Sequence, residues 1–195
     1  LYDHYWYIEE AQLKCLFEME RRGIRIDSEM LNTFAESLAK EMEDRAAEVN
    51  RLAGYPVNPN SPKQVGKLLF EDLKIKPRKR TSTGAPSCDE ESLAYFAANS
   101  DIPICKELLA YRKASKLLGT YAKGLMKHMA SDGNIHTSYS PVKLTGRLGS
   151  SEPNLQNIPR PGKDKHGIRG AFIAEPGCKL IGADYGQLEM RIMAH

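Results

Sequence analysis

The chain has 195 residues, of which 41% are hydrophobic and 27% charged, a composition that is ordinary for a globular protein and excludes a disordered or collagen-like chain. No apolar run approaches the roughly 20 residues that cross a membrane, and the first residues lack the charged and apolar regions of a signal peptide. The formal net charge of +3 is unevenly spread. Residues 1–60 carry 12 acidic and seven basic side chains, whereas residues 61–195 carry 13 acidic and 21 basic ones. The basic later part indicates a polyanionic partner.

The cysteines do not form a recognisable motif. Cys15, Cys88, Cys105 and Cys178 are scattered without a C-x-x-C pair, so we expect reduced, partly buried thiols rather than a disulfide framework. The histidines show no spacing typical of a zinc site. The chain does not begin with Met and stops inside a predicted helix, so we expect both ends to be cuts through a longer protein.

Hydrophobic spacing predicts two helices in the acidic first part of the chain. Apolar residues on one face predict a helix over residues 5–22 that stops at Gly23. A longer helix is predicted over residues 28–52, with Asp27 or Ser28 as its N-cap. Its apolar stripe consists of Leu31, Phe34, Leu38, Met42, Ala46, Val49 and Leu52.

Two capping boxes mark helix starts in the middle of the chain. Ser61 followed by Gln64, with a proline at the first helical position, predicts a helix N-terminus whose free N–H groups can also bind phosphate. Ser87 followed by Glu90 predicts a second N-terminus, for a helix that continues to about Asn99.

Basic residues concentrate in two stretches of the later part. Residues 61–80 contain seven basic and two acidic side chains, which fits either a solvated loop or contact with nucleic-acid phosphates. Residues 103–129 form a long predicted helix whose second half is basic and contains no acidic residue, a pattern that favours a binding role. Its basic residues are Arg112, Lys113, Lys116, Lys123 and Lys127.

Strands are predicted only after this helix. Asp132 and Gly133 form a turn signal, and residues 134–139 read as a strand. A mostly helical part followed by strands predicts the α+β fold class.

A lone carboxylate stands between two predicted elements near the end of the chain. The apolar run of residues 180–183 predicts a buried strand that leads to Asp184, and a helix is expected to begin near Gly186. Asp184 is therefore either the N-cap of this helix or an oxygen ligand for a hard cation such as Mg²⁺.

Residues 145–159 form an irregular, proline-bounded stretch that is rich in polar side chains. Arg147 lies in a Gly-flanked turn, and Asn154, Gln156 and Asn157 offer side-chain amides. Such groups can bind the acceptors that every base pair presents in the minor groove of DNA, or they can form hydrogen bonds within the loop itself.

Two long stretches of this sequence resemble signature motifs of family A DNA polymerases of the bacterial DNA polymerase I type. Residues 145–159 and 183–191 are similar to the family patterns TGRLSS-x-x-PNLQNIP and DYSQIELR. The differences are small, since Gly149 and Gly186 stand where the family usually has Ser, and Leu188 and Met190 replace Ile and Leu. Shorter matches extend the resemblance over essentially the whole chain, at residues 21–27, 58–64, 81–87 and 111–121.

The resemblance implies a fragment with three parts. Residues 1–27 would lead into the polymerase domain, residues 28–130 would form a helical thumb, and residues 131–195 would begin the antiparallel palm. The family's fingers helix, which grips the triphosphate, and its second metal-binding carboxylate are not in this chain.

The resemblance also assigns roles to residues. Asp184 would bind two Mg²⁺ ions with the Tyr185 carbonyl oxygen, and Glu189 would shape the sugar pocket as the second catalytic residue. The nucleotide-binding residues would be Tyr185, Gln187 and Glu189. The DNA-binding residues would be Asn58, Ser61, Lys63, Arg112, Lys116, Arg147, Asn154, Gln156, Asn157 and Gln187.

The implied activity is template-directed addition of deoxynucleotides to a primer 3′ end, in DNA replication or repair. The partners would be primer–template DNA and deoxynucleoside triphosphates, without a membrane, and the parent would be a monomer in the cytoplasm of a bacterium or of a phage-infected cell. Two alternatives are a non-catalytic duplex DNA-binding module and, more weakly, a Mg²⁺-dependent phosphohydrolase that uses Asp184.

Overall fold

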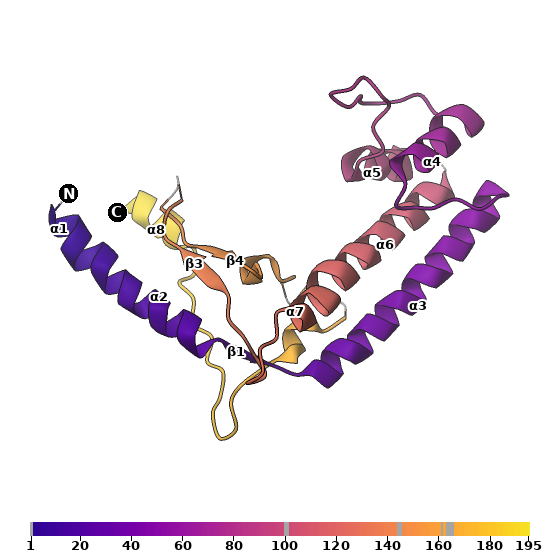
Figure 1. The fold of residues 1–195 in the computed structure, drawn as a ribbon. Coiled ribbons are helices and arrows are strands. Elements are labelled where there is room, and N and C mark those ends of the chain that lie inside the picture. The colour runs from indigo at the N-terminus through magenta and orange to yellow at the C-terminus, as the bar shows by residue number, and fades with distance from the viewer. Residues whose placement is uncertain (1, 100–101, 144–145, 161, 163–165) are drawn as a thin grey trace.

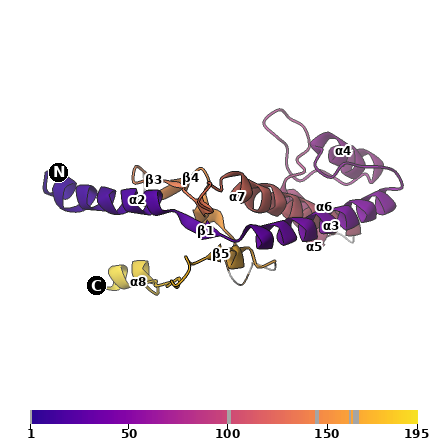
Figure 2. The same cartoon turned by 60° about the horizontal axis from the view of Figure 1, so that its bottom comes forward.

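The computed structural model describes residues 2–99, 102–143, 146–160, 162 and 166–195. Two helical arms diverge from a small central region of short strands, as Figure 1 shows. The first arm carries the N-terminus, and the second is built around the long helices α3 (Ser28–Ala53) and α6 (Pro103–Leu117). The view in Figure 2 shows that the yellow C-terminal segment runs back beside the first arm.

The first arm is one continuous helical segment. It consists of α1 (Tyr2–His4), the π-helical turn η1 (Tyr5–Glu9) and α2 (Glu10–Arg22). The segment ends at Gly23, whose N–H donates to the carbonyl oxygen of Met19 at 2.9 Å, which confirms the predicted stop. Leu16, on the predicted apolar face, is the only buried residue of this segment among those described, and the rest of that face, Ile8, Cys15 and Met19, is exposed.

Helix α3 (Ser28–Ala53) confirms the predicted long helix almost to the residue. The side chain of Asp27 is the N-cap and accepts a hydrogen bond from the Met30 N–H at 3.0 Å. Gly54 ends the helix in the left-handed conformation, with its N–H bound to the carbonyl oxygen of Asn50 at 2.9 Å. The apolar stripe of α3 packs against α6.

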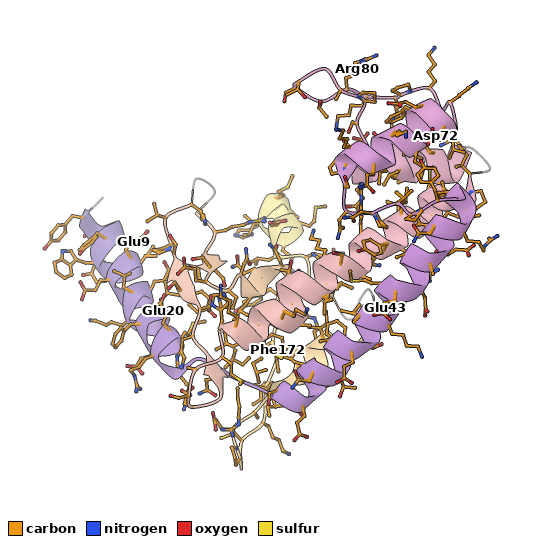
Figure 3. The ribbon with its side chains drawn as sticks, turned by 45° about the vertical axis from the view of Figure 1, so that its right-hand side comes forward. Glu9, Glu20, Glu43, Asp72, Arg80 and Phe172 are labelled. Carbon is orange, nitrogen blue, oxygen red and sulfur yellow. The ribbon has the colours of Figure 1, made fainter. Side chains whose placement is uncertain are left out.

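Three short helices form the far end of the second arm: α4 (Pro62–Gly66), the π-helical η2 (Lys67–Asp72) and α5 (Glu90–Asn99). Ser61 caps α4 as predicted, since its hydroxyl accepts from the Gln64 N–H at 3.4 Å. The second predicted capping box is wrong. Asp89, and not Ser87, caps α5 by accepting from the Ser92 N–H at 2.8 Å, because the short carboxylate lies three residues before that orphan donor. Figure 3 shows Asp72 and Arg80 at this end, far from Glu20 and Phe172.

The predicted helix over 103–129 is present but is not uniform. It consists of α6 (Pro103–Leu117), the π-helical η3 (Leu118–Lys123) and α7 (Gly124–Lys127). A π turn inserts one extra residue and changes the register only locally, so apolar spacing does not reveal it. The α3 and α6 helices pack lengthwise in opposite directions.

The sheet is small and antiparallel. Strand β1 (Ile24–Ile26) lies between β2 (Asn134–Ile135) and β5 (Phe172–Ile173), and β3 (Ser138–Ser140) pairs separately with β4 (Gly149–Ser151). The single strand predicted over 134–139 is therefore two strands in two sheets. The break falls at His136 and Thr137, whose side chains bond to other segments. Short 3₁₀ turns η4 (Leu155–Asn157) and η6 (Ile168–Ala171) follow the strands.

Two apolar clusters hold the second arm. The first lies where α3 meets the sheet and η3, and it includes Leu31, Leu38, Leu125, Ile135 and Ile168, all at most 1% exposed. The second lies at the far end of the arm and includes Val65, Leu93, Cys105 and Leu108. A mostly helical chain with a small antiparallel sheet confirms the α+β class.

The apolar run of residues 180–183 is not a buried strand, which corrects the prediction. Leu180 is 58% exposed and Ile181 is 91% exposed, and no described strand pairs with them. An apolar run becomes a buried strand only where neighbours bind its backbone and cover its side chains. The following helix, α8 (Leu188–Ala194), begins two residues after the expected Gly186.

All four cysteines are free, as predicted; Cys88 and Cys105 are buried, whereas Cys15 and Cys178 are exposed. Burial raises the pKa of the Cys105 thiol to about 11, so this thiol is unreactive at neutral pH. Within the described residues, no helix is both long and apolar enough to cross a membrane.

Candidate nucleic-acid interface and the Asp184 segment

A groove brings together predicted DNA-binding residues that are far apart in the sequence. On one side Lys116, Thr120 and His128 project from the continuous helix α6–η3–α7. On the other side lie Asn154 and Asn157, from the turn after β4. The groove has a volume of about 640 Å³. A second hollow of about 400 Å³ continues along the same helix past Lys116, where it is lined by Arg112 and Lys113.

The turn that forms one wall of the groove holds its own backbone. Asn154 Oδ1 accepts from the Gln156 N–H at 3.0 Å, and Gln156 Nε2 donates to the carbonyl oxygen of Leu148 at 2.9 Å. Asn154 and Gln156 therefore each use one side-chain atom for a hydrogen bond within the loop itself, which was the alternative to contact with the minor groove. The Asn157 side chain is exposed and has no hydrogen-bond partner among the described residues, so its amide remains available to a ligand.

Tyr121 joins the helical wall of the groove to this turn. It is 6% exposed, and its hydroxyl donates a hydrogen bond to the main-chain oxygen of Asn157. Burial raises the pKa of Tyr121, so the hydroxyl keeps its proton and remains a donor at neutral pH. The sequence does not indicate this contact, because two residues 36 positions apart leave no local signal.

Arg112 has a structural role in this fold. Its Nε donates to the carbonyl oxygen of Pro59 at 3.2 Å, and its Nη1 donates to the carbonyl oxygen of Cys88. It thereby ties the turn before α4 to the segment before α5. Lys113 and Lys116, one and four residues further on, are exposed and carry the free charge of this helix face.

The turn of residues 58–64 is also ordered by its own polar groups. The Gln64 side chain accepts from the Asn58 N–H at 2.7 Å, and the Asn58 side chain accepts from the Asn60 N–H at 2.9 Å. Lys63 is exposed in the first turn of α4, next to the Ser61 cap. A cation beside a helix N-terminus is a favourable place for a phosphate.

The basic run before α5 is partly neutralised. Arg78 forms an ion pair with Glu91 at 3.3 Å, and Lys79 pairs with Asp89 at 3.2 Å. Lys74 and Lys76 are exposed and form no ion pair with any described residue. The positive charge that is free to bind phosphate is thus smaller here than the sequence suggests.

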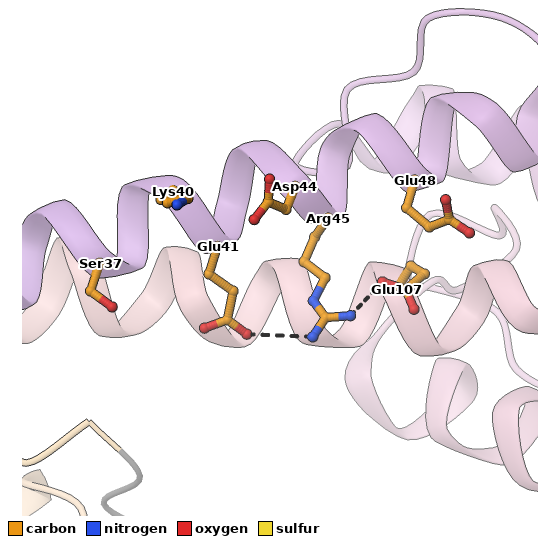
Figure 4. A pocket seen from close by; sticks show the side chains of 7 residues that line it. All are labelled: Ser37, Lys40, Glu41, Asp44, Arg45, Glu48 and Glu107. Carbon is orange, nitrogen blue, oxygen red and sulfur yellow. Dashed lines mark hydrogen bonds and ion pairs between the residues drawn. The ribbon is translucent and has the colours of Figure 1, made fainter.

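The acidic first part of the chain has a hollow of its own, of about 590 Å³, between α3 and α6. In Figure 4, Arg45 lies between Glu107, at 2.9 Å, and Glu41, at 3.8 Å. These contacts draw Arg45 away from any external anion. The remaining lining residues are Ser37, Lys40, Asp44 and Glu48, so this face repels phosphate.

The segment around Asp184 is exposed in this structure. Asp184 has no hydrogen-bond or ion-pair partner among the described residues, and Tyr185 is 78% exposed. Gln187, with a φ of 52°, occupies the N-cap position of α8, so Asp184 is not the N-cap. Glu189 forms an ion pair with Arg147, and both side chains are more than 70% exposed.

Asp184 does not form a metal centre with the other residues described here. The described part of the chain contains no group of three or more His, Cys, Asp or Glu side chains that could hold a metal ion. One carboxylate and one carbonyl oxygen are too few for the six oxygen ligands that Mg²⁺ requires without many waters.

Comparison with known families identifies the chain. The profile described as DNA polymerase family A matches residues 28–195, which is most of the sequence. This chain of the α+β class therefore belongs to DNA polymerase family A.

Individual relatives agree with this assignment. The chain is 41% identical over 190 residues to DNA polymerase I of Pseudomonas aeruginosa, covering 96% of the chain and 21% of that protein. It is 41% identical over 194 residues to the thermostable DNA polymerase I of Thermus filiformis, covering 98% of the chain and 23% of that protein. It therefore spans about a fifth of the length of these curated relatives.

A solved structure is also similar. It is described as the POL domain of Pol1 from M. smegmatis in complex with DNA primer-template and dNTP. The match has a TM-score of 0.81 at 39% identity, and it covers 92% of this chain and 32% of that chain.

Proposed function

We propose that this chain is part of a DNA-directed DNA polymerase that extends primer 3′ ends with deoxynucleotides on a DNA template, in replication or repair. Residues 28–130 serve as the thumb, residues 131–195 as the first part of the palm, and residues 1–27 lead into them. The parent acts as a monomer in the cytoplasm of a bacterium or of a phage-infected cell.

One observation carries the duplex-binding part of this proposal. The groove places Lys116 of the long helix opposite Asn154 and Asn157, although 38 and 41 residues separate them in sequence. A cation that contacts phosphate and amides that reach base edges are the two kinds of contact that position and inspect a duplex. The neighbour of known structure was solved with primer-template and dNTP, which supports the same ligands here.

The proposed roles of the remaining residues follow the family motifs. Asn58, Ser61 and Lys63 contact the DNA backbone, and Arg147, Gln156 and Gln187 inspect the minor groove. Glu189 excludes a ribose 2′-hydroxyl, and Asp184 with the Tyr185 carbonyl oxygen contributes to a two-Mg²⁺ site. The other metal ligands come from outside the described residues.

Salt-dependent binding tests the proposal on this chain directly. Fluorescence anisotropy with a labelled primer–template duplex, at several salt concentrations, should give a Kd that weakens steeply with salt. Replacing Lys113 and Lys116 together with Ala should reduce the slope of log Kd against log salt by about two, because about one counterion is released for each lost phosphate contact.

The control is Lys40→Ala, which removes one positive charge from the acidic hollow on α3 and should leave the slope unchanged. Lys113 and Lys116 are preferred to Arg112 because Arg112 holds the fold. A wild-type Kd that does not depend on salt would falsify the proposal, and so would a double variant that keeps the full slope.

A second candidate is a duplex-binding module without catalysis, since Asp184 belongs to no described group of three or more side chains that could hold a metal ion. Primer extension by the parent protein separates the two functions. A catalytic role requires that Asp184→Ala abolishes extension while duplex affinity is retained, whereas an extension-negative parent that still binds DNA favours the module.

A further inference from the structure

We propose that Thr137, Ser150 and Tyr121 are positioning residues for duplex binding, which fix the turn of residues 153–157 opposite Lys116 without contacting DNA themselves. This inference rests on the duplex-binding role proposed above, and it names the groups that set the shape of the groove. None of the three was a predicted site residue.

Two buried hydroxyl groups secure the first half of the turn. Thr137 is 5% exposed and Ser150 is 6% exposed, and their oxygens lie 2.8 Å apart. Thr137 Oγ1 lies 2.7 Å from the carbonyl oxygen of Pro153 and 2.9 Å from that of Ser151. The Leu155 N–H donates to Ser150 Oγ at 3.0 Å. Both ends of the Pro153–Leu155 segment are therefore bound to this hydroxyl pair.

The protons of this network are fully used. Each hydroxyl has one proton to donate and two lone pairs to accept with. The shortest contact assigns the Thr137 proton to the Pro153 carbonyl oxygen, and the Ser150 proton then goes to Thr137 Oγ1. Ser150 Oγ is left to accept from Leu155. Loss of the Thr137 hydroxyl removes the 2.7 Å contact to the Pro153 carbonyl oxygen and the 2.9 Å contact to that of Ser151, and leaves the Pro153 oxygen only the longer contact of 3.2 Å from Ser150 Oγ. The turn is therefore the part of the fold that this loss weakens.

Tyr121 secures the second half of the turn from the opposite side. Its hydroxyl donates to the main-chain oxygen of Asn157, and its ring belongs to the buried cluster under η3. The turn is thus anchored at Pro153, Leu155 and Asn157. Asn154 lies between these anchors, and its side chain and that of Asn157 line the groove.

A turn that is held before binding does not have to be ordered by the ligand. Ordering a side chain or loop at an interface opposes association, and rigid positioning removes that cost. Loss of one anchor should therefore weaken duplex binding by about three- to tenfold, the equivalent of immobilising one or two side chains. The number of phosphate contacts does not change, so the salt dependence should stay the same.

The experiment compares Thr137→Val, which keeps the shape of the side chain but removes the hydroxyl, with Thr137→Ser, which restores a hydroxyl. Ser92→Ala is the control, because Ser92 is also a buried hydroxyl but lies on α5, away from the turn of residues 153–157. Two quantities are measured on the folded chain: amide hydrogen exchange at Leu155 and Gln156, and Kd for a primer–template duplex over a range of salt.

We expect Thr137→Val to speed exchange at Leu155 and to raise Kd about three- to tenfold at every salt concentration, with a parallel salt line. Thr137→Ser should recover most of both properties, and Ser92→Ala should change neither. Tyr121→Phe, which removes only the hydroxyl from the core, gives the same test if Thr137→Val does not fold.

Two failures are distinguishable. If the wild-type chain binds no duplex, the proposed function itself is wrong. If the wild type binds and Thr137→Val exchanges faster at Leu155 while its Kd equals that of the wild type, the turn is a structural feature only and the positioning role is overturned. A steeper or shallower salt line for Thr137→Val would also contradict it, because that result would mean an altered number of phosphate contacts.

Discussion

Arg112, a proposed DNA-binding residue, is also engaged within the fold itself. Its guanidinium binds two main-chain oxygens, those of Pro59 and Cys88, which belong to segments on either side of it. Arg112→Ala should lower the free energy of unfolding by about 1–3 kcal/mol, since these partly buried acceptors lose their donor. Urea denaturation measures this. Lys113→Ala, which removes an exposed charge from the adjacent position, should change stability by less than about 0.5 kcal/mol.

His136 makes two contacts that depend on pH. Its Nδ1 lies 2.8 Å from the carbonyl oxygen of Glu20 and its Nε2 lies 3.1 Å from Asp132 Oδ2. Both partners are acceptors, so only the imidazolium can donate to both at once. The Glu20 carbonyl, and then Asp132, raise the pKa of His136 above its ordinary value of 6.5.

Because the folded-state pKa is raised, the stabilisation by His136 is complete below pH 6.5 and is lost as the pH rises through the folded value. The pKa of the Asp132 carboxyl is lowered, first by the Asn134 N–H that donates to it and then by His136. The stabilisation by Asp132 is therefore lost in acid instead. Urea unfolding at pH 5.5, 7 and 8.5 should show that the free energy of unfolding of the wild type falls as the pH rises. The fall should be smaller in His136→Gln. An equal decline in both would exclude His136 as the cause.

Gly23, at the element scale, joins the first helical arm to β1. Its φ is 65°, and a Cβ at this position would lie 2.7 Å from the carbonyl oxygen of Ile135 and 2.9 Å from the His136 ring. Gly54 ends α3 with a similar φ of 79°, but an added Cβ would meet nothing within 4 Å. Gly23 has a ψ of −165°, outside the left-handed region that Gly54 occupies with a ψ of 1°, so Gly23 differs from Gly54 in a less accessible backbone conformation as well as in the close approach.

Gly54→Ala should destabilise the chain by about 1 kcal/mol, the cost of a left-handed alanine. Gly23→Ala should cost clearly more, since β2 or the His136 ring has to move as well. Thermal or urea unfolding of the two variants checks the difference. Equal losses of stability would mean that the contact between α2 and the sheet is loose.

The sequence predicts elements well where the signal is local. The Asp27 and Ser61 caps and the apolar stripe of α3 need only neighbouring residues, and all three are present. The predictions that failed depend on distant partners. Residues 180–183 have strand-like composition but no described neighbour to pair with, and the strand at 134–139 breaks because Thr137 bonds to Pro153, 16 residues away.

The difference between local and distant signals also explains which residues of the groove could be predicted from the sequence. Lys116, Asn154 and Asn157 came from family motifs, and the structure places them around one groove. The anchors below them, Tyr121 and Thr137, could not be found from sequence, because a hydroxyl in an apolar stripe or a strand has no pattern of its own. Residue type identifies groups that contact a ligand more readily than groups that position them.

At the scale of the whole molecule, charge is divided between faces that the fold keeps apart. The hollow between α3 and α6 is acidic, whereas Lys116 lines the groove and Lys113 lines the second hollow that continues along α6. An anionic duplex is therefore directed to one face, and the ion pair between Arg147 and Glu189 lies outside both.

That ion pair joins segments 42 residues apart, and both side chains are proposed to contact ligands. Arg147 cannot bind Glu189 and a base edge with the same donors, so duplex binding should displace the carboxylate. Glu189→Gln should then tighten duplex binding by a factor of up to about five, the worth of an exposed ion pair. The gain should vanish when Arg147 is already Ala, because no donor remains to be released.

A double-mutant cycle of Arg147→Ala and Glu189→Gln, read as duplex Kd at low salt, measures this coupling on the chain itself. Glu175→Gln is the control: it removes the same charge from the ion pair with Arg25, at 2.9 Å, on β1. General repulsion between carboxylates and DNA would make Glu189→Gln tighten binding equally with and without Arg147, and would make Glu175→Gln tighten it too. Only a gain that depends on Arg147 supports an exchange of partners, in which the duplex takes Arg147 and leaves Glu189 free to face the sugar.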